Sequence, residues 1–157
     1  PSSLEICDAI PDLIYLADKY ALVALQDELV KVASSICNPW NAIPLFTHAL
    51  MYDTAVSLRE TLAKYVAQHV DQIVEHCHPD HWKTLPSDGV WEILRSPWLY
   101  LRQEITLFNL ITKWMICEEN RLSEAEDMVM DVKFHLLDLK CVQERYAIEL
   151  YSFVSGL

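Results

Sequence analysis

Apolar residues recur along this chain at the three- and four-residue spacing of amphipathic helices, in which one side packs into a core. The first stripe of such residues consists of Leu13, Leu16, Ala17 and Tyr20. A second stripe follows and consists of Leu22, Leu25, Leu29, Val32, Ala33 and Ile36. Because the two stripes meet near Tyr20-Ala21, we predict that the two helices pack as an antiparallel hairpin.

Asparagine, proline and serine separate the helices that follow. Asn38 can cap and Pro39 can open the next helix. Three serines stand where helix caps are expected, namely Ser57, Ser87 and Ser123. The spacing predicts helices over residues 40–50, 58–73 (with a start as early as 53), 81–85, 87–94, 103–117 and 123–131. The remaining run, residues 132–154, is predicted to be helical after a break at 135–138. We therefore predict an all-α fold of antiparallel helical hairpins packed in series.

The composition supports this fold and excludes some classes of binding partner. Only two glycines occur, Gly89 and Gly156, which argues against turn-rich β-sandwiches and against glycine loops that cradle phosphates. The 12 lysines and arginines against 23 aspartates and glutamates give a formal charge of −11, which disfavours nucleic acid and anionic membranes as partners. Five cysteines, an odd number without a CxxC pair, indicate reduced thiols in a cytoplasmic or nuclear protein. We expect protein partners.

One cluster has the residue types of a zinc site: His76, Cys77, His78 and His81. Four ligands within six residues, interrupted by Pro79, cannot easily converge on one ion, because structural zinc sites draw ligand pairs from distant segments. Cys77 also has histidine neighbours, but no oxyanion-hole motif accompanies it. We favour a polar helix end, and we predict a non-catalytic protein without a metal or cofactor.

The chain has five tryptophans, Trp40, Trp82, Trp91, Trp98 and Trp114, which is many for its length. Helix-spaced aromatics are usually core residues, and burial is favoured for Trp98 as well. Trp98 is nevertheless the candidate for exposure, because it follows Pro97 outside a regular helix. Exposed aromatics are typical anchors of protein interfaces, so Trp98 is a candidate partner-binding residue.

Four stretches of the sequence, in this order, resemble the BTB–BACK family. LIYLADKY (13–20) and ALVALQDELVKVAS (21–34) resemble the helical pair that closes BTB domains and extends into the three-box. The next stretch resembles the opening helices of the BACK domain at Asn41-Ala42, Ala49, Leu58, Leu62 and Tyr65. ILRSPWLYLRQEITLF (93–108), with Trp114 six residues beyond Phe108, is similar to the BACK signature. VKFHLL (132–137) is similar to its later Val-Arg-Phe-Pro-Leu-Leu run.

The sequence departs from the family pattern at two places, which affect the assignment of a subfamily but not the expected fold. Pro97-Trp98 replaces the usual acidic pair, and His135 replaces the usual proline. The Ser-Pro-x-Leu-Tyr run is also similar to germ cell-less-type BTB–BACK proteins.

The resemblance implies a three-box-like helical pair at residues 1–37 and a BACK-like helical domain at 38–157. It further implies a substrate adaptor of a cullin–RING ubiquitin ligase. In such adaptors the BTB domain, expected outside this sequence, forms a homodimer and binds the amino-terminal domain of the third cullin. The three-box extends that contact, and BACK is a rigid spacer that positions the protein substrate. The alternative is a BTB–BACK scaffold or transcriptional co-regulator that binds no cullin.

The resemblance also assigns roles to individual residues. Partner binding is expected of Leu22, Leu25 and Leu29, in addition to Trp98, whose role follows from its position after Pro97. Core positions are expected of Leu94, Phe108, Trp114 and Phe134. Phe108 and Trp114 are expected to hold two helix pairs together, so that their loss would unfold the module.

Overall fold

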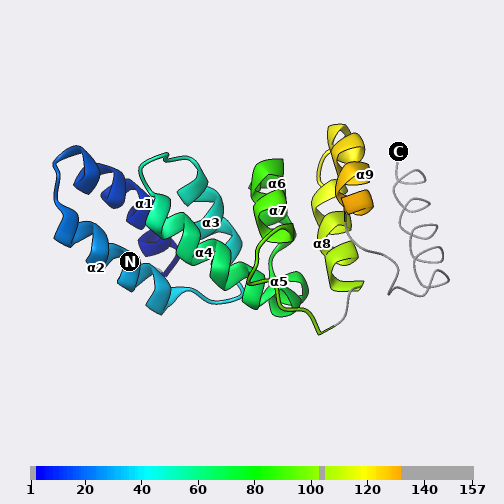
Figure 1. Cartoon of the computed structure of the whole chain (residues 1–157), viewed down its shortest axis with the longest axis horizontal. Coiled ribbons are helices and arrows are strands. Elements are labelled where there is room, and N and C mark those ends of the chain that lie inside the picture. Colours follow the sequence, from blue (N-terminus) through cyan, green and yellow to red (C-terminus); the bar gives the residue numbers. More distant parts are fainter. Residues whose placement is uncertain (1–2, 103–104, 132–157) are drawn as a thin grey trace.

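The computed structural model describes residues 3–102 and 105–131, and this part of the chain is all-helical. The helices follow one another along the long axis of the molecule (Figure 1). Their bounds are α1 Ser3–Lys19, α2 Val23–Ile36, α3 Ala42–Leu50, α4 Val56–Gln68, α5 Val70–His76, α6 Pro79–Thr84, α7 Ser87–Leu94, α8 Ile105–Met115, a 3-10 turn Glu119–Arg121, and α9 Leu122–Asp131. The predicted all-α fold of hairpins in series is confirmed. Within the same residues, no helix is both long and apolar enough to span a bilayer.

The first two helices form the predicted hairpin, and its turn is a Schellman motif. The Leu22 amide donates to the Ala17 carbonyl at 2.7 Å, and the Ala21 amide donates to the Asp18 carbonyl at 2.9 Å. Ala21 has a φ of 54°, the left-handed conformation that glycine adopts most easily. The chain thus reverses direction where the sequence pattern placed the turn, with an alanine at a position that favours glycine.

The buried side of the hairpin differs from the predicted one. In α1 the buried stripe is Ile10, Ile14 and Ala17, whereas the exposed residues include Leu13, Leu16 and Tyr20. In α2 the buried residue is Ala33, with Leu29 and Ile36 half-buried. The predicted stripe of α1 is therefore wrong except at Ala17. The helix carries two adjacent apolar stripes, and spacing alone does not decide which of them packs within the chain.

The core of the next pair, α3 and α4, agrees with the predicted spacing. Its buried residues include Ile43, Phe46, Ala49, Leu58, Leu62 and Val66. α3 begins at Ala42 rather than at Trp40, and the Asn38 side chain caps the turn that precedes it, as predicted. The Asn38 Oδ1 atom accepts hydrogen bonds from the amides of Trp40 at 3.0 Å and Asn41 at 3.2 Å.

The long helix predicted to run to residue 73 is interrupted at His69, between α4 and α5. The His69 backbone leaves the helical region, with φ −119° and ψ 19°. A ring nitrogen of His69 donates to the Tyr65 carbonyl at 2.9 Å, and the two rings stack with centroids 4.2 Å apart. This side-chain bond helps to satisfy the end of α4. The break turns Val70 and Ile73 into the core.

The prediction that Ser57, Ser87 and Ser123 cap helices is wrong. Each serine lies one or two residues beyond the cap position, inside the first turn of its helix. α4 begins at Val56 and α9 at Leu122, while Ser87 is the first residue of α7. In two cases a backbone carbonyl just before the helix already accepts a helical bond. The Ala55 carbonyl accepts from Arg59 at 2.9 Å, and the Pro86 carbonyl accepts from Val90 at 3.3 Å.

A second part of the core lies where α6, α7 and α8 meet. Trp82 and Trp114 are buried there, and the Trp114 indole donates to the Leu85 carbonyl at 2.8 Å. Leu94 is half-buried against this core, and Phe108 is buried on α8 outside the described core cluster. Phe134 and the helix predicted for residues 132–154 lie outside the described residues.

Arg121 is a buried charged residue that no sequence pattern singled out. Its guanidinium donates to the carbonyls of Trp82 at 3.0 Å, Trp114 at 3.1 Å and Lys83 at 2.6 Å. The Nε atom lies 3.3 Å from the Glu118 carboxylate, and the guanidinium stands 4.6 Å from the centre of the Trp114 ring. These carbonyls belong to the last turns of α6 and α8, where helix carbonyls lack partners within the helix. Arg121 therefore caps both helices.

Candidate protein-interaction surfaces

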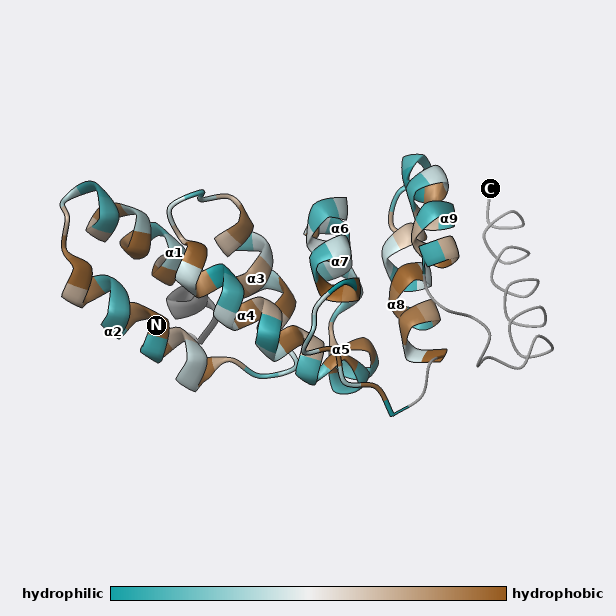
Figure 2. Cartoon of the chain, viewed as in Figure 1, coloured by the Kyte–Doolittle hydropathy of each residue, from teal (hydrophilic) through white to brown (hydrophobic). Residues whose placement is uncertain are grey.

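The hairpin α1–α2 exposes an apolar surface at one end of the stack. Hydrophobic residues are brown along both helices in Figure 2. The exposed large apolar residues here are Leu13, Tyr15, Leu16, Tyr20, Leu22, Val23, Leu25 and Val32. Of the predicted partner-binding leucines, Leu22 and Leu25 are exposed by 49% and 44%, whereas Leu29 is half-buried against the core. Exposed apolar residues gathered on one hairpin make it a candidate site of protein interaction.

Within this surface, one seam runs along α2. It consists of Leu22, Leu25, Leu29, Val32 and Ile36. Their alternating steps of three and four residues are those of the apolar seam through which two helices pack side by side. We call this set the α2 seam.

A polar cluster fastens the hairpin to α3. The Tyr52 hydroxyl donates to the Asp12 carboxylate, and the His48 Nε2 atom lies 3.3 Å from the same carboxylate. The Tyr15 and Tyr52 rings stack with centroids 5.3 Å apart. The hydrogen bond to Asp12 raises the pKa of Tyr52. This contact sets the orientation of the hairpin relative to the helices that follow.

The loop between α7 and α8 is fixed by backbone bonds, and it leaves Trp98 in solvent. The Tyr100 amide donates to the Ala67 carbonyl at 3.0 Å, and the Arg102 amide donates to the Asp71 carboxylate at 2.9 Å. Trp98 is 53% exposed, so the expectation of burial is wrong. The Lys64 ammonium stands 4.2 Å from the centre of the Trp98 ring. Nothing in the sequence indicated Lys64, which meets Trp98 only because α4 packs beneath this loop.

The residues of the zinc candidate cluster have different neighbours. His76 stacks on Trp40 with ring centroids 5.3 Å apart, and His78 accepts a hydrogen bond from the Asp80 amide at 3.4 Å. Cys77 and His81 approach each other, with 3.7 Å between Sγ and Nδ1, and the His78 and His81 rings have centroids 5.9 Å apart. Residues 3–102 and 105–131 contain no group of three or more His, Cys, Asp or Glu side chains arranged to hold a metal ion.

The ionisation of the same cluster argues against nucleophilic chemistry there. Cys77 is buried, and burial raises the pKa of its thiol to about 12. A thiolate is the reactive form of cysteine, and at neutral pH Cys77 is a thiol. Burial lowers the pKa of His81, so its imidazole is held in the neutral form. This arrangement is that of a packed helix junction.

The sequence from α3 onward matches one family model. The BACK model, BTB And C-terminal Kelch, matches residues 42–147. The chain belongs to the BACK family. No curated protein and no solved structure matches the chain.

The BACK domain begins at α3, and α1–α2 precedes it. BACK is a non-catalytic domain of BTB–Kelch-type adaptors, so the general role of this chain is that of a protein-interaction adaptor. The germ cell-less resemblance and the domain boundary at residues 37–38 stay predictions.

Proposed function

We propose that this BACK protein is the substrate-receptor subunit of a cullin–RING ubiquitin ligase, and that it contacts the amino-terminal domain of the third cullin through α1–α2. The observation that supports the proposal is the exposed apolar α2 seam. It lies on the hairpin whose sequence resembles a three-box, directly before the BACK domain. A helix of the cullin packing on this seam would remove its three exposed residues, Leu22, Leu25 and Val32, from water.

In this role the BACK domain acts by rigid positioning. Close-packed helices transmit geometry with little slack. The Asp12 cluster ties the hairpin to α3, and Arg121 ties α6 to α8. A protein substrate held by another part of the protein would therefore keep a defined distance from the cullin. We place this function in the cytoplasm or nucleus, in a homodimer formed through a BTB domain.

The test is the affinity of the native protein for the cullin amino-terminal domain, measured by biolayer interferometry for wild type and Leu25→Asp. Complete burial of a leucine contributes about 1.5–3 kcal/mol. Because Leu25 is 44% exposed, roughly 1 kcal/mol of this would be gained on binding. An aspartate at the interface adds the cost of desolvating a carboxylate, so the affinity should fall at least about tenfold.

The matched control is Ile116→Asp, at a residue that is 47% exposed beyond the end of α8. Circular dichroism should show both variants folded, since both residues are exposed. The proposal is wrong if wild type has no measurable affinity or if both variants bind alike. In the first case, the alternative is the scaffold or transcriptional co-regulator that binds no cullin.

A further inference from the structure

A groove of about 630 Å³ lies between α4 and α7 and is closed on one side by the loop at residues 95–98. Its polar lining includes Glu60 and Lys64 from α4 and Glu92 from α7. A second hollow of about 490 Å³ also has Trp98 in its lining, together with Gln68 and His69. Trp98 is exposed and borders both hollows, so successive side chains of an extended peptide can occupy the two hollows on this surface.

Two carboxylates share this groove. Glu60 and Glu92 both line it; burial raises the pKa of Glu92, Arg59 partly lowers it, and the charge of Glu60 raises it. The Arg59 Nε atom lies 3.7 Å from the Glu92 carboxylate. Glu60 is exposed and forms no ion pair with any residue in the described part of the chain. A cation placed between Glu60 and Glu92 would relieve their repulsion.

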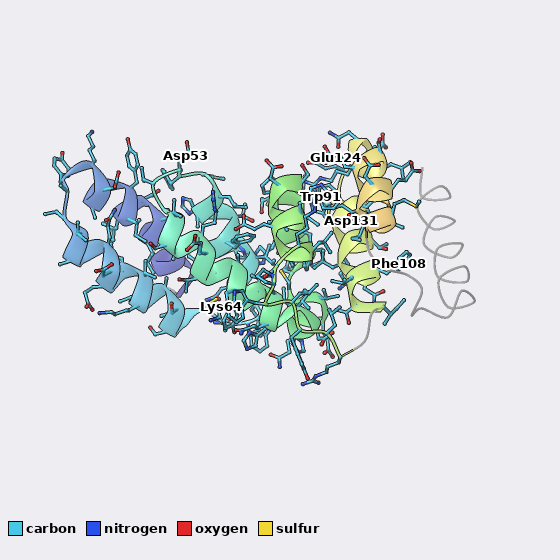
Figure 3. The ribbon with its side chains drawn as sticks, in the orientation of Figure 1. Asp53, Lys64, Trp91, Phe108, Glu124 and Asp131 are labelled. Atoms are coloured by element: carbon cyan, nitrogen blue, oxygen red, sulfur yellow. The ribbon has the colours of Figure 1, made fainter. Side chains whose placement is uncertain are left out.

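Each of the two cations that line the groove has a contact of its own. Lys64 stands over the Trp98 ring, as noted above. The Arg95 guanidinium stands 4.1 Å from the centre of the Trp91 ring, and its Nε atom lies 3.4 Å from the Asp131 carboxylate. Lys64, Trp91 and Asp131 are labelled in Figure 3, where they come from α4, α7 and α9. Glu92 is paired with Arg59, so Glu60 is the carboxylate of the groove that has no ion-pair partner among the described residues, and the chain as a whole carries −11.

We propose that this groove binds an extended basic segment of a partner protein. A lysine or arginine of the segment lies between Glu60 and Glu92, and a neighbouring side chain packs on Trp98. The negative field of the chain attracts such a segment, and the exposed indole supplies the desolvated contact that anchors it. The backbone bonds at Tyr100 and Arg102 hold the Trp98 loop in place, which lowers the entropy cost of binding. This inference does not depend on cullin binding.

The probe is an array of fluorescein-labelled nonapeptides with one or two lysines or arginines among leucine, proline and serine. Each peptide is compared with the same peptide carrying glutamine in place of the basic residues. Fluorescence anisotropy with the native protein should show at least about tenfold tighter binding of the best basic peptides than of their glutamine counterparts. The affinity should fall as salt is added, because exposed charges are screened.

The structure offers a matched control for the contact with Trp98. Trp98→Ala should weaken binding of the best peptide at least about tenfold, whereas Trp40→Ala, at a tryptophan that is 59% exposed elsewhere, should leave it unchanged. Glu60→Gln should weaken binding about threefold or more and reduce its salt dependence, whereas Glu124→Gln on α9 should not. Circular dichroism checks that all four variants are folded. Leu25→Asp should keep full peptide binding, which separates this proposal from the cullin proposal.

Three outcomes would overturn the inference. The first is equal affinity for basic and glutamine peptides, or no binding by any peptide of the array. The second is an equal effect of Trp98→Ala and Trp40→Ala. The third is self-association of the native protein in sedimentation velocity that Trp98→Ala abolishes, because that result assigns the groove to a second copy of the chain.

Discussion

Removing the guanidinium of Arg121 should destabilise the protein more than removing any exposed arginine. The perturbation is Arg121→Met, which keeps an apolar stem of similar length but donates no hydrogen bond. The substitution leaves the carbonyls of Trp82 and Lys83, at the end of α6, without their donor. It also removes the link that the same guanidinium makes between α6 and the Trp114 carbonyl of α8.

The magnitude follows from the three hydrogen bonds. Each hydrogen bond to a charged donor contributes about 1.5–3 kcal/mol, and each buried carbonyl left unpaired costs about 1–3 kcal/mol. The desolvation of the guanidinium in the native protein offsets part of this sum, because Arg121 is only 8% exposed. We therefore expect Arg121→Met to lower the free energy of unfolding by about 3 kcal/mol. Arg121→Lys should cost about 2 kcal/mol, because an ammonium cannot reach three carbonyls in a fixed plane.

The assay is urea unfolding followed by circular dichroism, with an unchanged dependence on urea as the sign of a two-state transition. Arg95→Met is the control, since Arg95 also stands over a tryptophan ring and faces a carboxylate, but its side chain is 63% exposed. This control should cost less than about 1 kcal/mol. The reasoning fails if Arg121→Met costs no more than Arg95→Met.

Two further predictions concern the hairpin turn and the buried thiol. Ala21→Gly should raise the free energy of unfolding by about 0.5–1 kcal/mol in the same urea assay, because the left-handed conformation costs an alanine about 1–2 kcal/mol and the freer unfolded glycine offsets part of the gain. Ala9→Gly, at an exposed position in the middle of α1, should lower the free energy of unfolding by a similar amount. A lower free energy of unfolding in both variants would contradict the expectation. Since burial raises the pKa of Cys77 from 9.0 to about 12, this thiol contributes stability that is present below pH 9 and is lost as the pH rises toward 12. In the Cys77→Ala variant, the urea concentration at the midpoint of unfolding should therefore fall less as the buffer is made alkaline. Mass spectrometry should also find that Cys77 of the native protein does not react with iodoacetamide. Alkylation of the native protein as fast as of the urea-unfolded protein would refute the burial of this thiol.

Sequence spacing predicted those parts of the fold in which a helix has a single apolar side. Ile43, Phe46 and Ala49 of α3 lie on one stripe, and all three are buried. In α1 the apolar residues form two neighbouring stripes, and only contacts with α2 and α3 select Ile10 and Ile14. The break at His69 was missed because it depends on a bond from one side chain to one carbonyl. An apolar period carries no information about such a bond.

The candidate interaction site was predictable only in part. Pro97 indicated correctly that Trp98 lies outside a regular helix, but the exposure of Trp98 depends on backbone bonds to Ala67 and Asp71, which come from other helices. Arg121 follows two glutamates in sequence, a pattern typical of a solvated surface. Its burial is set by carbonyls of residues 82, 83 and 114, which converge only after α6 and α8 have packed.

The serial stacking of the helices has a consequence for how this chain can change over evolution. α1 packs mainly on α2 and α3, whereas α9 packs mainly on α8 and the 3-10 turn. In such an arrangement each unit is stabilised chiefly by its neighbours, and the effects of distant substitutions add. The hairpin surface at one end can therefore acquire new residues without compensating changes at the other end. One partner of the adaptor can be exchanged while the rest of the stack is inherited unchanged.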